Sequence, residues 1–453
     1  MSKKIVVLGA GISGLSTAYW LVKKGFDVTI LEIKNEPGGS MISKKIDGFL
    51  IDYGPNSGLE TTPLIRKLVE EVNLSDKMIY ANAAASKRYI LKNGELIPLP
   101  MSPGSFIRTK LFSPGAKFRL MAEPFISKSD DGYYQSIAQF VRRRLGGEFL
   151  DYAIDPFVSG VFAGDPEKLS VKSAFPKLYR LEEVYGGLIK GMIKGARERK
   201  QRSEESKQSA KMFSFIEGMQ SLPNSIAANL KDKIVFNAQV LNVLGTNDHQ
   251  WKVIFELDGK QESLIADSII STLPAYVASK VFCELDDKLA EHLNSIYYPP
   301  VMVLYLGYKK SDIQRKLDGF GFLIPSKEKK HFLGAIWSSS IFPNRCPDDK
   351  AAFTLFIGGA RSPQIFNMEK SKLIKIVLSE FHEIMKIEGE PIIIESIMWE
   401  KAIPQYNLGY IEHESYIEQF EKKNKGIVLS GNYRGGISVG DCIKNSELRI
   451  RDL

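Results

Sequence analysis

The chain has 453 residues, of which 44% are hydrophobic and 25% are charged, so we expect an ordinary globular protein of two or three domains rather than a disordered or fibrous one. Its formal net charge of +8 is a modest excess that suits an anionic ligand or a membrane surface without requiring either. Three distant cysteines and five scattered histidines argue against a disulfide framework or a metal site, and favour a reducing compartment and an organic cofactor.

The N-terminal segment predicts a dinucleotide-binding βαβ unit. An apolar strand at residues 4–8 enters a Gly-x-Gly-x-x-Gly turn, and a helical pattern and a second strand at residues 28–31 follow. In this motif the glycines allow a tight turn, close approach of a pyrophosphate, and close packing of helix on strand. The residues expected at the cofactor are Gly9, Ala10, Gly11, Ile12, Ser13 and Gly14, with Glu32 at a ribose. Because the first strand runs directly into this turn, we expect it to stay in the folded protein rather than act as a signal peptide.

The middle of the chain changes from loops to helices and then to strands. The loop at residues 37–40 is expected to bring Gly39 and Ser40 near the cofactor, and a strand at residues 49–51 leads into a turn at residues 52–57. From residue 101 to about residue 199 the pattern is mainly helical, and the mixed charges of residues 197–207 indicate a solvated linker.

Strand patterns return after this linker. Turns rich in Gly, Asn and Asp separate residues 234–236, 239–241 and 251–255, which predicts an antiparallel meander of these three strands. More strands are expected at residues 267–272, 301–305 and 353–357, and a helix over residues 370–387. No apolar segment has the length needed to cross a membrane.

The last segment repeats the order of strand, glycines and helix, at residues 426–430, 431–436 and 438–443. If it folds back onto the first unit, the positive end of its helix would stabilise negative charge on a reduced flavin. The alternative is a routine terminal βα unit that contacts no cofactor.

Four segments together resemble the FAD-dependent protoporphyrinogen oxidases, within the wider flavin amine oxidase superfamily. They are residues 9–15 with Glu32 and 38–39, residues 48–57, residues 159–166 with 169–170 and 174–176, and residues 431–442. The first two are shared across the superfamily, whereas the last two are similar to the porphyrinogen enzymes in particular. Residues 319–326 and 342–345 reinforce the likeness.

The resemblance implies an α/β protein, α+β overall, with three domains. It implies a discontinuous, Rossmann-like FAD-binding domain of residues 1–80, 208–290 and 425–453. The other two are a mixed-sheet substrate-binding domain of residues 81–100 and 291–424 and an inserted helical domain of residues 101–207.

The implied activity is the FAD-dependent, oxygen-using, six-electron oxidation of protoporphyrinogen IX to protoporphyrin IX in haem biosynthesis. Such chemistry needs the reacting carbon held against the flavin in a dry pocket, and it needs neither a metal nor a nucleophilic triad. No side chain of this sequence stands out as a general base, so we assign no catalytic residue.

The resemblance also assigns binding residues. Arg88 matches a propionate-binding arginine and Trp337 a pocket aromatic, while Phe320, Leu323 and Gly164 are further pocket candidates. Taken without the resemblance, Arg88 is typical of a surface charge and Trp337 of a core residue. For FAD, the implied contacts are Gly54, Pro55, Asn56 and Ser57 near the flavin, Val240 at the adenine, and Trp399, Ile437, Ser438 and Val439 on the flavin side.

One feature departs from the superfamily pattern. Many members place arginines beside the glycine doublet Gly38-Gly39, whereas this sequence has Asn35, Glu36 and Ser40 there. The departure leaves open which cation, if any, lies beside the cofactor phosphates.

The helical domain is similar to one that attaches relatives to a membrane face. Residues 106–112 and 118–121 interleave apolar side chains with Arg and Lys, as interfacial segments do, although helices packed on neighbours show the same pattern. We therefore expect a cytoplasmic protein, peripheral on the inner face of the cell membrane. The oligomeric state stays open, with a homodimer as one option.

Three other functions stay open on the sequence. The nearest is oxidation of coproporphyrinogen III to coproporphyrin III, whose substrate carries four carboxylates in place of two; we expect a preference for protoporphyrinogen. A second is a flavin amine oxidase, and a third is a non-catalytic nucleotide-binding or scaffold protein. Nucleic-acid binding has no motif behind it, because the basic residues are dispersed.

Overall fold

The computed structural model describes residues 2–129, 134–202 and 210–451. A five-stranded parallel sheet has the order β10-β2-β1-β14-β20. Its strands are β1 (Lys4–Leu8), β2 (Asp27–Leu31), β10 (Ile234–Val235), β14 (Ser268–Ser271) and β20 (Ile427–Leu429). The sheet thus joins the start, the middle and the end of the chain.

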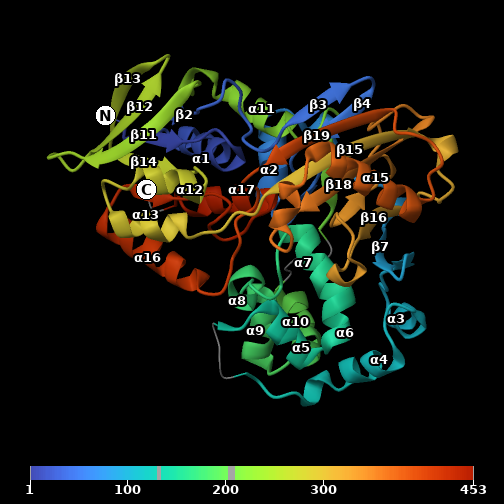
Figure 1. The fold of residues 1–453 in the computed structure, drawn as a ribbon. Helices are drawn as coiled ribbons and strands as arrows, with labels where there is room; N and C mark the ends of the chain where they lie inside the picture. Colours follow the sequence, from blue (N-terminus) through green and yellow to red (C-terminus); the bar gives the residue numbers. More distant parts are fainter. Residues whose placement is uncertain (1, 130–133, 203–209, 452–453) are drawn as a thin grey trace.

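Both faces of this sheet are covered by helices, because successive side chains of a strand point to opposite sides. Ile5 and Val7 of β1 belong to one buried cluster, with α1 (Ile12–Lys23), α2 (Pro63–Glu71), α11 (Ser221–Asn229) and α17 (Val439–Leu448). Val6 and Leu8 belong to the cluster on the other face, with α12 (Ala275–Val281), α13 (Asp287–Asn294) and α16 (Tyr410–Lys423). Figure 1 shows the first helix and the last one beside each other.

The antiparallel meander is present, but the prediction of its first strand is wrong. Its strands are β11 (Ala238–Gly245), β12 (Trp251–Leu257) and β13 (Lys260–Ala266). Ile234 and Val235 instead form β10 and pair in parallel with Ile30 and Leu31. The sequence hid β13 because its first four residues are charged or polar and lie exposed.

A second, mixed sheet has seven strands in the order β19-β15-β18-β17-β16-β7-β8. They are β7 (Lys87–Lys92), β8 (Glu95–Pro98), β15 (Val301–Lys309), β16 (Gly319–Leu323), β17 (Gly334–Ile336), β18 (Lys350–Gly358) and β19 (Ile393–Trp399). Only the pairing of β16 with β7 is parallel within this sheet. The helix α15 (Lys370–Met385) packs on it, and α14 (Ser338–Ile341) follows β17.

Two small sheets connect these units. One is the hairpin of β3 (Ser43–Ile46) with β4 (Phe49–Asp52). The other has the order β5-β9-β6, with β5 (Gly58–Leu59), β6 (Met78–Tyr80) and β9 (Met212–Phe215). The mixed α/β architecture agrees with the predicted fold class, while the three domain boundaries stay predictions.

Helices occupy residues 103–202 in the described part of the chain, below the sheets in Figure 1. They are α3 (Pro103–Arg108), α4 (Pro114–Met121), α5 (Ile137–Arg144), α6 (Gly147–Phe149), α7 (Asp155–Phe162), α8 (Val171–Ala174), α9 (Pro176–Tyr185) and α10 (Leu188–Arg202), with a π-helical turn at Leu150–Ile154. The predicted linker is partly wrong, because α10 continues through residues 197–202; the rest of that linker lies outside the described residues.

A buried ion-pair network joins the helices of this unit. The Arg144 guanidinium lies 2.8 Å from Glu123 and 3.0 Å from Glu182, and it is fully buried. Glu123 also accepts hydrogen bonds from the backbone N–H groups of Leu188 and Ile189, at 2.7 and 3.0 Å, where α10 begins. One cation therefore holds two acidic side chains and, through Glu123, the start of a helix.

We expect Arg144→Met to lower the free energy of unfolding by about 3–5 kcal/mol, because the buried Glu123 carboxylate would lose its cation and Glu182 would keep only its pair with Arg143. Arg142→Met is the matched control in the same helix. Its pair with Glu167 is exposed, at 52% and 49% of the two side chains, so its loss should cost less than about 1 kcal/mol. Urea denaturation followed by circular dichroism measures both, and equal losses would contradict the assignment.

Candidate functional site

The glycine turn at the carboxyl end of β1 opens α1 to an anion. Gly9 has a φ of +96°, and a Cβ on Gly14 would lie 1.9 Å from the Gly9 carbonyl oxygen. A Cβ on Gly11 would meet nothing within 4 Å, and no side chain caps the helix there. The first backbone N–H groups of α1 and the positive end of its dipole are therefore accessible to a phosphate.

Glu32 lies beside this turn, at the end of β2. It is buried, and its carboxylate accepts hydrogen bonds from the backbone N–H groups of Ala10 at 2.6 Å and Lys34 at 3.0 Å. The Ala238 N–H donates to the Glu32 backbone carbonyl at 2.9 Å, which places the start of β11, two residues before Val240, beside Glu32. An acidic side chain, a strand edge and the glycine turn thus meet at one place, as a nucleotide site requires.

The glycine doublet packs against the glycine turn. The Gly38 N–H donates to the Ala10 carbonyl at 2.9 Å, and a Cβ on Gly39 would lie 3.3 Å from the Gly11 Cα. The Lys34 ammonium donates to the Gly39 carbonyl at 2.9 Å. Lys34 is a cation that the sequence did not lead us to expect here; the available signal was a basic residue close after Glu32.

The turn at residues 53–57 extends this surface. A Cβ on Gly54 would lie 1.9 Å from the Ser40 carbonyl oxygen, so glycine is required for the close approach. The Trp399 indole N–H donates to the Tyr53 carbonyl at 2.9 Å, and the Asn56 amide donates to the Gly54 carbonyl at 3.0 Å. The predicted residues Gly54 to Ser57 and Trp399 are thus together, adjoining Ser40.

The C-terminal segment folds back onto the N-terminal one. Ser446 of α17 donates to the Ser13 carbonyl of α1 at 3.0 Å. At the start of α17, Ser438 caps the helix by accepting from the Asp441 N–H at 3.1 Å. A Cβ on Gly440 would lie 3.1 Å from the carbonyl oxygen of Leu59, just beyond the 53–57 turn. Residues 437–439 therefore lie near both the opening helix and that turn.

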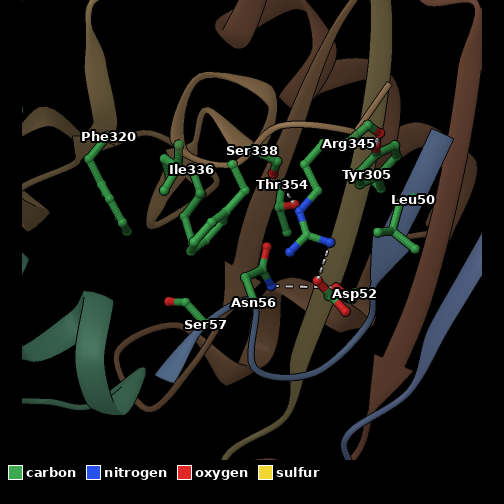
Figure 2. Close-up of a pocket in the computed structure, with 12 residues that line it drawn as sticks. Leu50, Asp52, Asn56, Ser57, Tyr305, Phe320, Ile336, Ser338, Arg345 and Thr354 are labelled. Atoms are coloured by element: carbon green, nitrogen blue, oxygen red, sulfur yellow. Dashed lines mark hydrogen bonds and ion pairs between the residues drawn. The ribbon is translucent and has the colours of Figure 1, made fainter. Parts of the chain in front are cut away.

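A small cavity lies between this turn and the seven-stranded sheet. Asn56 and Ser57 line it from the turn, while Phe320, Ile336 and Ser338 line it from the sheet side (Figure 2). The exposed Arg88 on β7 has its guanidinium 5.6 Å from the centre of the Phe320 ring. Two of the predicted substrate residues, Arg88 and Phe320, are thus brought together beside this cavity.

The other three predicted substrate residues lie elsewhere. Leu323 packs on α7, where a Cβ on Gly160 would approach it to 2.5 Å, and Gly164 faces Gln405. The Trp337 side chain is fully buried and stacks on Tyr89, with ring centres 5.6 Å apart. Its neighbours Ile336 and Ser338 line the cavity, since adjacent side chains point apart. A substrate role for Trp337 stays a prediction.

A buried ion pair closes one end of the cavity. The Arg345 Nη1 lies 3.3 Å from the Asp52 Oδ2. Burial raises the pKa of Asp52 above its usual value, although Arg345 and hydrogen bonds from Ser43 and Met219 oppose the rise. Burial likewise lowers the pKa of Arg345. The sequence predicted a role for neither residue, because nothing in it indicates that residue 345 meets residue 52.

Residues 12–446 match the family described as flavin containing amine oxidoreductase. The chain belongs to this family. It is therefore an oxidoreductase with FAD as its cofactor.

Three curated relatives that are named as porphyrinogen oxidases match nearly the whole length of this flavoprotein. It is 34% identical to protoporphyrinogen oxidase 2, chloroplastic/mitochondrial, of Arabidopsis thaliana, over 97% of this chain and 92% of that protein. It is 33% identical to the mitochondrial protoporphyrinogen oxidase of Nicotiana tabacum, over 98% and 93%. Coproporphyrinogen III oxidase of Bacillus subtilis (strain 168) is 28% identical, over 99% and 97%. Membership of the protoporphyrinogen oxidase group, predicted from four segments, is confirmed.

Solved structures share the fold. A crystal structure of a protein from Exiguobacterium sp. 255-15 superimposes with a TM-score of 0.81 at 22% identity, covering 100% of this chain and 98% of that one. Reduced UDP-galactopyranose mutase gives a TM-score of 0.75 at 16% identity, covering 98% and 92%. The predicted fold class is confirmed by these likenesses.

The residues on the surface built from the glycine turn fit FAD. The open side of Gly11 and the uncapped N-terminus of α1 suit its pyrophosphate. When bound, FAD supplies acceptance of a hydride from a carbon centre. The residues that would hold it are Gly9, Ala10, Gly11, Ile12, Ser13, Gly14, Glu32, Gly39, Ser40, Gly54, Pro55, Asn56, Ser57, Val240, Trp399, Ile437, Ser438 and Val439, and these roles stay predictions. The part of the protein chain itself is to bind FAD, to orient FAD and the substrate toward each other, and to exclude water.

We expect Gly11→Ala to weaken FAD binding on the order of tenfold or more, because its methyl group would occupy the open space that a pyrophosphate needs. Gly147→Ala is the matched control, since a Cβ there also meets nothing within 4 Å. Titration of the apoprotein with FAD, followed by flavin fluorescence, measures the affinity, and a thermal unfolding scan verifies that both variants fold. Equal FAD affinities in the two variants would remove Gly11 from the pyrophosphate site.

Proposed function

We propose that the protein oxidises protoporphyrinogen IX to protoporphyrin IX, using FAD and then O2 as electron acceptor. The observation that carries this proposal is the position of Arg88. Its guanidinium lies over Phe320, beside a cavity that adjoins the predicted flavin-side turn. A cation next to apolar walls suits a substrate with propionate arms and a flat pyrrole body. The full-length similarity to plant protoporphyrinogen oxidases supports the same substrate.

In this proposal the protein promotes the reaction by positioning the porphyrinogen against the bound flavin. Arg88 binds a propionate, Phe320 contacts the macrocycle, and the buried sheet behind them excludes water. Removal of hydride from the macrocycle is then a matter of distance and alignment to the bound flavin. No side chain is assigned as a general base.

Coproporphyrinogen III is the second candidate substrate. Relatives in Bacillus subtilis and in Staphylococcus aureus are named coproporphyrinogen III oxidase, at 28% and 27% identity. That substrate carries more carboxylates and so would need more cations than Arg88.

We expect kcat/KM to be higher for protoporphyrinogen IX than for coproporphyrinogen III. Arg88 is the one cation that we assign to a substrate carboxylate, and a substrate with fewer carboxylates leaves fewer of them without a cation. Fluorescence of the porphyrin products under identical aerobic conditions gives both values. A higher value for the tetracarboxylate would transfer the proposal to coproporphyrinogen. Oxidation of neither porphyrinogen, together with oxidation of an amine, would replace it by an amine oxidase.

We expect Arg88→Ala to raise KM on the order of tenfold or more while kcat changes little, because it removes a contact made before and during the reaction. Lys87→Ala is the matched control: this neighbouring lysine pairs instead with Asp318, at 2.6 Å, on the protein surface. Steady-state kinetics at a fixed oxygen concentration separate KM from kcat. An unchanged KM in Arg88→Ala would exclude the propionate role.

We also propose that the helical unit binds to a membrane surface. In the described chain, no helix combines the length and the apolar composition that a membrane span requires. Apolar side chains are exposed on and near α3 and α4, at Met101, Ile107, Phe118, Met121 and Phe125, the last of them 89% exposed. Exposed cations, Arg108 and Lys110, lie among them. Exposed apolar groups with adjacent cations support contact with anionic lipid.

The predicted membrane segment contains core residues as well. Leu111 and Phe112 are buried and pack with Ile90, and Phe106 and Leu120 are partly buried against neighbouring clusters. The surface that we propose is therefore narrower than residues 106–112 and 118–121, and it extends to Met101 and Phe125.

We expect the triple substitution Phe118→Ser, Met121→Ser and Phe125→Ser to reduce binding to phosphatidylglycerol vesicles on the order of tenfold, because it removes the apolar groups that would enter the lipid. Ile265→Ser on β13 is the control; Ile265 is 44% exposed, and Figure 1 places β13 at the opposite end of the molecule from α4. Co-sedimentation with vesicles measures both. Equal binding of the triple variant and the wild type would contradict the proposed surface.

A further inference from the structure

The segment at residues 52–57 lies between the predicted FAD site and the cavity beside Arg88. Gly54 packs on the Ser40 carbonyl of the glycine-doublet loop, and Asn56 and Ser57 line the cavity. Any displacement of this segment would therefore change the geometry of both sites at once.

The Arg345 side chain, on a loop of the seven-stranded sheet, is linked to residues 52–57 at two places. Arg345 lies on the loop between α14 and β18, and only 3% of it is exposed. Its Nη1 lies 3.3 Å from the Asp52 carboxylate, and its Nη2 donates to the Ser214 Oγ at 2.5 Å. Ser214 in turn donates to the Asn56 carbonyl at 3.4 Å. The guanidinium thus reaches the first residue of the segment directly and a later one through a serine.

The surroundings hold Arg345 and Asp52 in place. The Arg345 carbonyl accepts from the Leu50 N–H at 2.9 Å, which attaches its loop to β4. The Asp52 carboxylate also accepts from Ser43 Oγ at 2.5 Å and from the Met219 N–H at 2.9 Å. Arg345 Nη1 forms the ion pair with Asp52 but makes no hydrogen bond within the described residues. Arg345 also lines the cavity (Figure 2).

Stability alone is a weak explanation for such a pair. Two charges that leave water for a buried site lose solvation comparable to what their attraction returns, and apolar replacements are often as stable. A pair of fixed geometry does, however, define one position for the backbone that carries it.

We propose that Arg345 is a positioning residue for the oxidation. Its pair with Asp52 and its bond to Ser214 clamp residues 52–57 in the position where they meet both FAD and the porphyrinogen. The inference concerning the substrate rests on the proposed function, whereas the inference concerning FAD does not.

The test compares Arg345→Met, Asp52→Asn and the double variant with the wild-type holoenzyme. Arg345→Met should slow anaerobic bleaching of the flavin by protoporphyrinogen on the order of 100-fold, because small misplacements of reacting groups cost that much. KM should change less than about threefold, since Arg88 is intact. Arg345→Lys should not restore the rate, because an ammonium cannot bind Asp52 and Ser214 in the same fork geometry.

The midpoint potential of bound FAD separates positioning from charge. Asp52→Asn leaves the Arg345 cation unbalanced in a buried place, so we expect the potential to rise by about 30 mV, which is a tenfold change in relative affinity for the reduced cofactor. The double variant removes both charges, so its potential should return to near the wild-type value. Its bleaching should stay slow, because the clamp is absent.

Arg361→Met is the matched control. Arg361 binds Asp155 through one nitrogen, at 2.6 and 2.7 Å to the two carboxylate oxygens, at the junction of the seven-stranded sheet with α7. It should leave the potential and the visible spectrum of bound FAD as in the wild type. If Arg345→Met fails to fold, Ser214→Ala keeps the ion pair of Arg345 with Asp52 but removes the acceptor of Arg345 Nη2 and the link to Asn56, and it should still slow bleaching.

A native bleaching rate in Arg345→Met or in Ser214→Ala would overturn the clamp. Restoration of both the rate and the potential in the double variant would also overturn it, since charge alone would then explain the effect. If porphyrinogen fails to bleach the wild type, the proposed function fails instead. In that case a native visible spectrum and potential in both single variants, Arg345→Met and Asp52→Asn, would overturn the clamp, and altered ones would support it.

Discussion

The parallel pairing of β1 with β2 and β14 is the constraint on which the rest of the structure depends. All strand pairs of this sheet are parallel, so the carboxyl ends of its strands lie at one edge. The glycine turn follows β1, Glu32 follows β2, and Gly431 follows β20 at that edge. Ligands of open α/β sheets bind at this edge because loops converge there and helices begin there.

Close approach of backbone to backbone then assembles the site from distant segments. Gly14 packs on Gly9 and Gly54 packs on Ser40 at distances that a side chain would prevent, and Gly39 lies in tight contact with Gly11. Each contact joins the next loop to the previous one. The result is a surface made of backbone groups, whose dipoles are fixed before any ligand arrives and need no reorganisation.

Buried ion pairs connect this surface to the other parts of the molecule. Arg345 and Asp52 join the seven-stranded sheet to the segment that follows β4, and Arg361 and Asp155 join the same sheet to α7. Arg144 joins Glu123 and Glu182 within the helical unit. In each case a long side chain with several donors links separate elements of the fold, and the desolvated charges tolerate little displacement.

The sequence by itself determined the dinucleotide unit, the family and some of the strands and helices, because local patterns carry them: apolar alternation, glycine spacing and a terminal carboxylate. It did not determine β10, whose short apolar run fits either sheet, or β13, whose exposed side chains leave no apolar pattern. The burial of Trp337, the cation at Lys34 and the pairing of Arg345 with Asp52 were decided only by the tertiary structure. These features depend on which way a side chain points and on which distant loop it meets, and residue order alone specifies neither.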